Sequence, residues 1–487
     1  MALVLPALVC LASGLLLVCL GWSRTGPLPP DLLLRASLAV GYGLGVFSVI
    51  YFLSRVCNVT HLMRVDLLVL ALLMAAVVLA WARTQSTNAM AIPASAGEQG
   101  PAWFHRVLLA AFLIALCSAL YSTLMHMRAN PHGDGWDSHA IWNLHARFLF
   151  LGGPHWRDGF TPLIPWSHPD YPLLLPASIA HFWTYLGRDD PRVPASISFF
   201  FTFATVGVLF SALSILRGRA QAMLGAITLL ATPTFIEQGA WQYADVPLSF
   251  FYLATAVLLC LHDEKTLQAS SKPPAGGLLA LAGVAAGFAA WTKNEGVLFL
   301  GAILLARQWI SLREARRQAP QGALHGAKIA FARHSGLLLA GSAPVFLLII
   351  YFKHRVAPPG DLFSDPSSML HRALQLARDW AIIRWYVRGF FRFGGWLLVP
   401  GSLLLVGLYF VAGREDHRAA PPGFRTSVLA LALTLVGYFA IYLITPYDIY
   451  WHLRFSLSRL FLQLWPSTVF LFFLAVRGLP GDSRSEV

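Results

Sequence analysis

The sequence predicts an all-helical protein that crosses a membrane many times. Its 487 residues are 57% hydrophobic and only 12% charged, whereas about a quarter of the residues of a soluble protein are charged. The apolar runs are roughly 16 to 23 residues long and do not alternate with polar residues, which favours spanning helices over barrel strands. The expected fold class is therefore an all-α polytopic membrane protein, because a helix satisfies its own backbone groups in lipid.

About thirteen segments have the length and composition expected of a transmembrane helix. They are residues 2–22, 32–53, 65–82, 106–125, 194–216, 219–236, 245–261, 276–291, 296–309, 335–352, 394–412, 426–444 and 459–477. The first has no positive residue before its long apolar run, so we expect a retained span with an outside N-terminus. The apolar run 172–186 is short and broken by prolines, which favours an interfacial or re-entrant helix in the first large loop.

The basic residues set the expected orientation of the spans. Six Lys and Arg residues lie between positions 307 and 333, which makes this loop cytoplasmic and, by alternation, places the tail 478–487 inside as well. Basic cytoplasmic loops that face anionic lipid also explain the net charge of +13. No nucleic-acid partner is expected, because the chain has no basic arm and no recognised nucleic-acid module.

Most of the other polar segments fall on the outer face under the same alternation. They are the loop 128–171, the segments 238–245 and 293–295, the basic loop 353–393 and the segment 446–454. A transporter places its polar groups near the membrane midplane, in broken helices. Polar groups gathered on one face instead favour an enzyme that works at that surface.

The loop 128–171 is the longest polar stretch of the chain and contains the first candidate catalytic residues. Two glycines predict a turn, after which Asp137 is placed to cap a helix over residues 138–150. A carboxylate held in this way is also rigidly aimed, so Asp137 could take a proton from an acceptor hydroxyl. Asp134 stands three residues earlier and could share that role.

The same loop supplies candidate substrate-binding residues in His139, His168 and Asp170. Capping alone explains Asp170 equally well, because it precedes a proline and a helix start. The density of His and Asp side chains is compatible with a divalent cation, but their spacings are loose. We therefore assign no metal ligand and expect no obligatory cofactor.

A second acidic position occurs at Asp245, which precedes a proline and an apolar run. Asp245 either caps that helix or faces Asp137 across a cavity, where paired carboxylates can divide the roles of base and orienting group. The neighbouring Tyr243 is a candidate substrate contact.

Lys293 and Glu295 interrupt the apolar stretch 276–309. As one long helix, this stretch would place both charges near the membrane centre, at about 2.5–3.5 kcal/mol each. A hairpin that turns at these residues avoids that cost and leaves Lys293 at the outer surface. There Lys293 could stabilise a phosphate or simply reach the interface, and Glu295 is a candidate substrate contact.

Two late segments add cations and aromatic residues to the outer face. Arg384, Arg388 and Arg392 repeat every four residues on an amphipathic helix, which indicates either an interfacial anchor or a binding surface for a lipid phosphate. The segment 446–466 begins with a cluster of Asp448, His452, Arg454 and Arg459 among aromatic residues. A helix cap and an interfacial aromatic belt explain this cluster about as well as a substrate site at Asp448 and His452 does.

No nucleotide-binding motif is present, neither a Walker loop nor a convincing Rossmann fingerprint. A group-transfer enzyme of this kind would therefore take an activated donor that is already in the membrane.

The order of these motifs resembles the GT-C superfamily of integral-membrane glycosyltransferases. The sequence has an outer-loop Asp that opens a helix ending in Ala146–Arg147, then His-Pro and Tyr-Pro, Ala-Asp-x-Pro-Leu before a span, Thr-Lys at a hairpin tip and a late basic loop. The closer likeness is to the protein-mannosyltransferase-like members of family 39 and the bacterial aminoarabinose-transferase-like members. It covers roughly residues 106–477, so residues 1–105 would be three additional spans.

The resemblance implies transfer of a sugar from a polyprenyl-phosphate donor, usually with inversion, at the periplasmic face of a bacterial inner membrane. The acceptor would be a lipid, a glycan or a protein. The family's first-loop Asp corresponds to Asp137, its second-loop Asp to Asp245 and its Thr-Lys pair to Thr292–Lys293. Ser138 departs from the family pattern, since many members have Glu after the first Asp. A transporter, flippase or ligase of lipid-linked glycans is the alternative.

Overall fold

The computed structural model describes residues 3–22, 29–84, 101–268, 276–318, 324–360, 366–396, 400–413 and 420–477. All regular elements in these ranges are helical. Ten of the described helices are long and apolar enough to cross a membrane by length and composition, and two apolar helices are shorter. The predicted all-α polytopic fold class is thereby confirmed.

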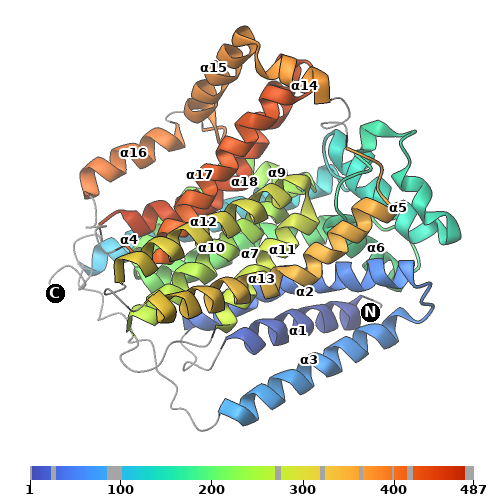
Figure 1. The fold of residues 1–487 in the computed structure, drawn as a ribbon, viewed down its shortest axis with the longest axis horizontal. Helices are drawn as coiled ribbons and strands as arrows, with labels where there is room; N and C mark the ends of the chain where they lie inside the picture. Colours follow the sequence, from blue (N-terminus) through green and yellow to red (C-terminus); the bar gives the residue numbers. More distant parts are fainter. Residues whose placement is uncertain are drawn as a thin grey trace.

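The long helices run side by side across one bundle (Figure 1). In chain order the elements are α1 (Val4–Gly21), α2 (Pro29–Val56), α3 (Leu62–Thr84), α4 (Ala102–Ala129), η1 (Ser138–Trp142), α5 (Asn143–Leu151), η2 (Gly153–Phe160), η3 (Pro165–Ser167), α6 (Leu174–Leu186), α7 (Arg192–Leu216), α8 (Arg219–Leu230), α9 (Pro233–Ala240), α10 (Asp245–Gln268), α11 (Gly277–Thr292), α12 (Asn294–Gln318), α13 (Leu324–Arg355), α14 (Pro366–Ala373), α15 (Leu376–Arg392), α16 (Gly401–Ala412), α17 (Pro422–Ile444) and α18 (Ile449–Ala475). Figure 1 places α3 at one edge of the bundle and α14 to α16 along the opposite edge.

Two predicted spans differ from the helices that form. The run 219–236 is divided into α8 and α9, because Pro233 has no backbone N–H and disfavours a helical conformation at Thr232 before it. Within the predicted span 394–412, the described helix is α16, which begins at Gly401 and has 12 residues. The run 172–186 forms α6, a helix of 13 residues that is buried along most of its length.

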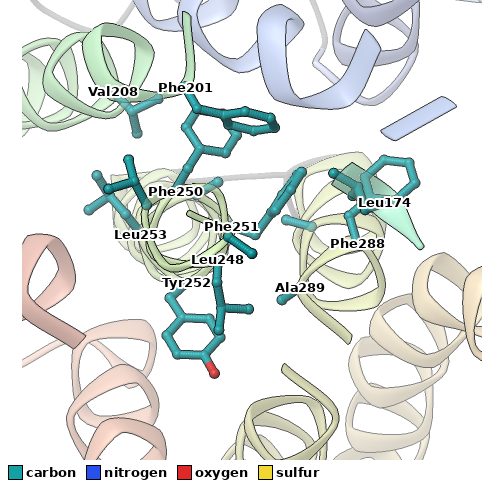
Figure 2. Close-up of a cluster of buried hydrophobic side chains, with 14 of the residues drawn as sticks. Leu174, Phe201, Val208, Leu248, Phe250, Phe251, Tyr252, Leu253, Phe288 and Ala289 are labelled. Atoms are coloured by element: carbon teal, nitrogen blue, oxygen red, sulfur yellow. The ribbon is translucent and has the colours of Figure 1, made fainter. Parts of the chain in front are cut away.

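The centre of the bundle is α10, whose most apolar 18-residue stretch is completely buried. Figure 2 shows its side chains packed against neighbours on all sides, with Phe250 beside Phe201 of α7 and Phe251 beside Phe288 of α11. A helix that is apolar all round is stable only when other helices surround it. The first residue of this helix, Asp245, thus belongs to the most completely buried of the described spans.

The first three helices differ in how closely they join the bundle. The Tyr42 hydroxyl on α2 donates to the carbonyl oxygen of Leu281 at 2.7 Å, and the Ser178 hydroxyl on α6 donates to Leu44 at 3.0 Å. α3 is mostly uncovered, yet its buried Asp66 contacts the Nε2 atom of His181 at 2.9 Å. α2 is therefore part of the core. That residues 1–105 form a unit separate from residues 106–477 stays a prediction.

Polar segments that are far apart in the chain meet at one end of the bundle. Lys353 contacts Asp170 at 3.2 Å and Asn294 at 2.9 Å, which joins three of the segments assigned to the outer face. Asp137 likewise contacts Arg459 at 2.7 Å. The side of the membrane on which this end lies stays a prediction.

Candidate functional site

A network of charged side chains surrounds the buried carboxylate of Asp245. One carboxylate oxygen accepts hydrogen bonds from Lys293 Nζ at 3.0 Å and from Gln463 Nε2 at 2.5 Å. The other accepts from Arg459 Nε at 2.9 Å. Asp245 is 0% exposed, and a buried charge is tolerated only when it is paired and hydrogen-bonded in this way.

Arg459 joins the first-loop acid to this network. Its Nη2 atom lies 2.7 Å from Asp137 Oδ2 and 2.8 Å from Asp245 Oδ2. The guanidinium also stacks over the Tyr243 ring, 4.7 Å from the ring centroid. Asp137 and Asp245 are therefore close together, as predicted, and both carboxylates form ion pairs with the same arginine. The sequence placed Arg459 in a terminal cluster but gave it no role.

Lys293 lies at the hairpin turn that the charge pattern predicts. α11 ends at Thr292, Lys293 is extended and α12 begins at Asn294. The expectation that the hairpin exposes Lys293 is wrong, since the residue is 4% exposed. It contacts Glu295 at 2.8 Å as well as Asp245, so binding a phosphate would require these ion pairs to open.

The central ion cluster consists of Asp137, Asp245, Lys293, Glu295 and Arg459. It contains three carboxylates and two cations, which gives a formal charge of −1. Its acids come from three separate segments. Asp137, Arg459 and Glu295 keep side-chain exposures of 16%, 17% and 13%, whereas Lys293 and Asp245 are buried. The arrangement therefore offers a fixed carboxylate at the edge of a buried, hydrogen-bonded network.

The loop around Asp137 holds this carboxylate without using it as a helix cap. The helix begins with a π-helical turn, Ser138–Trp142, and no backbone N–H bonds to the Asp137 side chain. Gly135 has a φ of +78°, and a Cβ there would lie 2.3 Å from the Tyr243 hydroxyl oxygen. Only glycine fits both the conformation and the contact. The predicted capping role is thus replaced by the bond to Arg459.

Tyr243 lies between the loop and the ion cluster and is buried, while its contact with substrate stays a prediction. Burial and then the negative charge of Asp137 raise the pKa of the Tyr243 phenol to about 12. The phenol is therefore a neutral hydrogen-bonding group at physiological pH.

Asp134, the alternative base, is half-buried. In the part of the chain that the structure describes, its carboxylate makes no hydrogen bond or ion pair, whereas that of Asp137 is held by Arg459. Asp137 faces the ion cluster, and Asp134 is the less constrained of the two acids.

Asp170 belongs to a second polar contact at the same end of the bundle. Its Oδ2 atom accepts a hydrogen bond from the Asn294 side chain at 2.8 Å and lies 3.2 Å from Lys353 Nζ. α6 begins only at Leu174, and Asp170 does not cap it. Because Asn294 follows Lys293 directly, this contact ties the first loop to the hairpin that holds Lys293.

The remaining candidates have local partners. His139 is exposed and its ring lies 6.4 Å from that of His132, while His168 has a left-handed backbone and stacks on Tyr171 at 4.7 Å. The Asp448 carboxylate accepts the Trp451 N–H at 2.8 Å and so caps α18.

His452 lies on α18, the helix that also carries Arg459. Its ring packs against the Tyr442 ring of α17, with 5.0 Å between the ring centroids. Arg384, Arg388 and Arg392 are exposed on α15, where they make no ion pair or hydrogen bond with any other described residue. Their predicted roles in binding substrate and donor phosphate stay predictions.

A metal site is not evident in the described ranges. No group of three or more His, Cys, Asp or Glu side chains there is arranged to hold a metal ion. The carboxylates of the ion cluster are instead paired with Lys293 and Arg459.

The comparison with protein families finds a match that lies over the centre of the bundle. Residues 178–340 match the family of dolichyl-phosphate-mannose-protein mannosyltransferases. The match contains Asp245, Lys293 and Glu295, and it agrees with the resemblance seen in the motif order. It spans 163 of the 487 residues, with Asp137 before it and Arg459 after it. No curated protein and no solved structure matches the chain.

Proposed function

We propose that this protein is a membrane glycosyltransferase that moves a sugar from a polyprenyl-phosphate donor to a hydroxyl group of a lipid, glycan or protein. The observation that carries the proposal is the ion cluster, in which a partly exposed first-loop carboxylate is held beside a buried second carboxylate by Arg459. The matched family supports a donor of this class, because its name specifies a sugar linked to a lipid phosphate.

The proposed reaction is a single displacement at the anomeric carbon. Asp137, or Asp134 in its place, takes the proton from the acceptor hydroxyl. The acceptor oxygen forms a bond to the anomeric carbon as the bond from that carbon to the phosphate oxygen breaks. The electron pair leaves with the polyprenyl phosphate, which is a good leaving group and needs no general acid. One displacement inverts the configuration of the sugar.

The cluster itself is suited to orienting the base and poorly suited to binding the resting donor. Its formal charge of −1 would repel a phosphate, and Lys293 would have to release Asp245 or Glu295 to contact one. Arginines outside the cluster, such as Arg384, Arg388 and Arg392, are therefore better placed for the phosphate. We place the site at the periplasmic face of a bacterial inner membrane, with the N-terminus outside and the C-terminus in the cytoplasm.

Substitution of the base tests the proposal in purified protein reconstituted in nanodiscs. Asp137→Asn should lower the release of polyprenyl phosphate from a labelled polyprenyl-phosphate sugar by about 10²- to 10⁴-fold, with donor binding retained. Asp158→Asn is the matched control, since Asp158 is a highly exposed acid of the same loop and should leave turnover unchanged.

The same assay distinguishes the two candidate bases. Loss of turnover in Asp134→Asn with activity retained in Asp137→Asn would transfer the base role to Asp134. Full turnover in both variants would contradict a transferase mechanism at this loop.

A further inference from the structure

Gln463 is an uncharged side chain that contacts the central ion cluster from within the bundle. It lies on α18, one turn after Arg459, and is completely buried. Its Nε2 atom donates a hydrogen bond to Asp245 at 2.5 Å and lies 3.5 Å from Glu295 Oε1. An amide nitrogen carries two N–H groups. The nitrogen of Gln463 therefore faces both of the carboxylates that pair with Lys293.

Tyr438 of α17 holds the Gln463 amide in the orientation that the cluster requires. The two ends of an amide have similar shapes and opposite roles, because the nitrogen donates and the oxygen accepts. The Tyr438 hydroxyl donates to Gln463 Oε1 at 2.5 Å. With the amide reversed, its oxygen would face the carboxylates of Asp245 and Glu295, which only accept hydrogen bonds. The bond from Tyr438 therefore keeps the donating end of the amide toward the cluster.

Tyr252 of α10 closes these contacts into a ring of polar groups. Its hydroxyl donates to the backbone oxygen of Glu295 at 2.9 Å and lies 3.2 Å from the Tyr438 hydroxyl. Figure 2 shows the Tyr252 ring on the opposite side of α10 from Phe250. Tyr252, Tyr438 and Gln463 are all completely buried. Their polar atoms all have partners within the ring, as a buried polar network requires.

The ring is connected to the candidate base through Asp245 and Arg459. The same Nη2 atom of Arg459 contacts Asp245 and Asp137. A displacement of the Asp245 carboxylate therefore also displaces the arginine that holds Asp137. Packing alone does not require an amide at position 463, since an apolar side chain would fill the space among the helices. A polar side chain inside a membrane bundle is costly and indicates a functional role.

We propose that Gln463 is a positioning residue of the transfer reaction, an inference that rests on the proposed function. Gln463 holds the Asp245 carboxylate, Asp245 holds Arg459, and Arg459 aims the Asp137 carboxylate at the acceptor hydroxyl. Tyr438 acts one step further away, through the orientation of the amide. Because Gln463 does not touch the substrate, its loss lowers turnover at saturating donor and leaves the KM for the donor unchanged.

The pH dependence of Gln463→Glu tests this role in the full chain reconstituted in nanodiscs. Glutamate has nearly the shape of glutamine, but its carboxyl group donates to Asp245 only when it is protonated. Turnover of a labelled polyprenyl-phosphate sugar is measured for the variant and the native protein at each pH. The ratio of variant to native turnover should be reduced by about tenfold or more at about pH 8. It should rise as the pH is lowered to about 5.5, because the neighbouring carboxylates favour the protonated form.

Gln221→Glu is the matched control for the added carboxyl group. Gln221 is also a buried glutamine, but its amide nitrogen donates to the backbone oxygens of Val476 and Arg477, at 3.4 and 3.3 Å. Neither acceptor belongs to the ion cluster. Turnover per folded molecule of Gln221→Glu, relative to the native protein, should therefore stay constant over the same pH range.

Tyr438→Phe provides a second test that adds no charge. Without the hydroxyl, the Gln463 amide is free to rotate, and turnover should fall by about two- to tenfold with the donor KM unchanged. Tyr42→Phe is the control, since it removes a comparable buried hydrogen bond, to the Leu281 carbonyl oxygen at 2.7 Å. Its unfolding temperature should fall while its turnover per folded molecule stays close to that of the native protein.

The native protein separates the inference from the function on which it rests. Native turnover with a pH-independent ratio for Gln463→Glu, or with the same pH dependence in Gln221→Glu, would overturn the positioning role and leave the proposed function standing. Absence of native turnover with every polyprenyl-phosphate sugar would overturn both. If Gln463→Glu does not fold, Tyr438→Phe decides: turnover equal to that of Tyr42→Phe would overturn the inference, and a selective loss would support it.

Discussion

The bundle buries an Asp–Arg ion pair at each of its two ends, and the two pairs are built differently. At one end Arg307 of α12 donates to both oxygens of Asp263 on α10, at 2.6 and 3.0 Å, and both residues are buried. At the other end Arg459 divides its contacts between Asp245 and the partly exposed Asp137. The Asp263 carboxylate also lies 2.7 Å from Nδ1 of the adjacent His262. The first pair is therefore confined to two helices, and the second extends to a loop.

This difference indicates what each pair contributes. A bidentate pair with one carboxylate and one cation, closed off from solvent, joins two helices and offers nothing to a ligand. The pair at the other end belongs to a cluster with one carboxylate in excess and with one acid at its edge. Arg307 is therefore expected to stabilise the fold. Arg459 is expected both to stabilise the fold and to position the Asp137 carboxylate.

The largest effect is expected from breaking the closed pair. Arg307→Met leaves the Asp263 carboxylate buried without its cation, which should lower stability by about 3–5 kcal/mol. The loss is measured as a lower unfolding temperature in detergent, while turnover per folded molecule stays close to that of the native protein. The double variant Asp263→Asn with Arg307→Met should recover much of the stability. A selective loss of turnover in Arg307→Met would contradict the assigned structural role.

At the central ion cluster we expect a smaller loss of stability together with a loss of activity. Arg459→Lys keeps the charge, but an ammonium group cannot reproduce the planar contact with both Asp137 and Asp245. Stability should fall by about 1.5–3 kcal/mol, the value of a charge-assisted hydrogen bond. Turnover at saturating donor should fall as well, because Asp137 loses its fixed position. Unchanged turnover with lowered stability would mean that Arg459 is structural, like Arg307.

The third effect concerns the first loop and develops gradually with pH. His145 is buried against Ser167, and burial lowers the pKa of its imidazole to about 3. The unfolded chain takes up this proton near pH 6.5 and the folded chain does not. Stability should therefore decrease as the pH falls from about 6.5 toward 3, by at most about 1.4 kcal/mol per pH unit from this residue.

His145→Gln removes that contribution and isolates it from the titration of the carboxylates. Unfolding temperatures of the two proteins between pH 7 and pH 4.5 should diverge in slope, with the variant less sensitive to acid. Parallel slopes would show that His145 takes up its proton in the folded state too.

The sequence predicts where the helices lie better than it predicts which charged residues contact one another. The hairpin at Lys293 follows from the cost of placing charge within lipid, which acts locally and can be inferred from a short segment. The burial of Lys293 could not be inferred in this way, because it depends on Asp245, 48 residues earlier. The break at Pro233 has a local cause, but the long apolar run around it predicts a single span.

Three acids with the same local pattern illustrate why site roles are hard to predict. Asp137, Asp170 and Asp448 each precede a helix, and their sequence context is compatible with a capping role for all three. Only Asp448 caps its helix. The other two carboxylates bond to Arg459 and to Lys353 with Asn294, all of which are distant in sequence. Local sequence shows that an acid can cap, and tertiary packing decides whether it does.

The position of Arg459 also has a consequence for how the protein is made. Arg459 lies in α18, the last described helix, 214 residues after Asp245. A nascent chain inserted only as far as α17 therefore carries Asp245 and the first loop without the residue that joins them. The site is completed only when α18 is inserted, so chains that stop before α18 are expected to be inactive and to leave Asp137 without its partner.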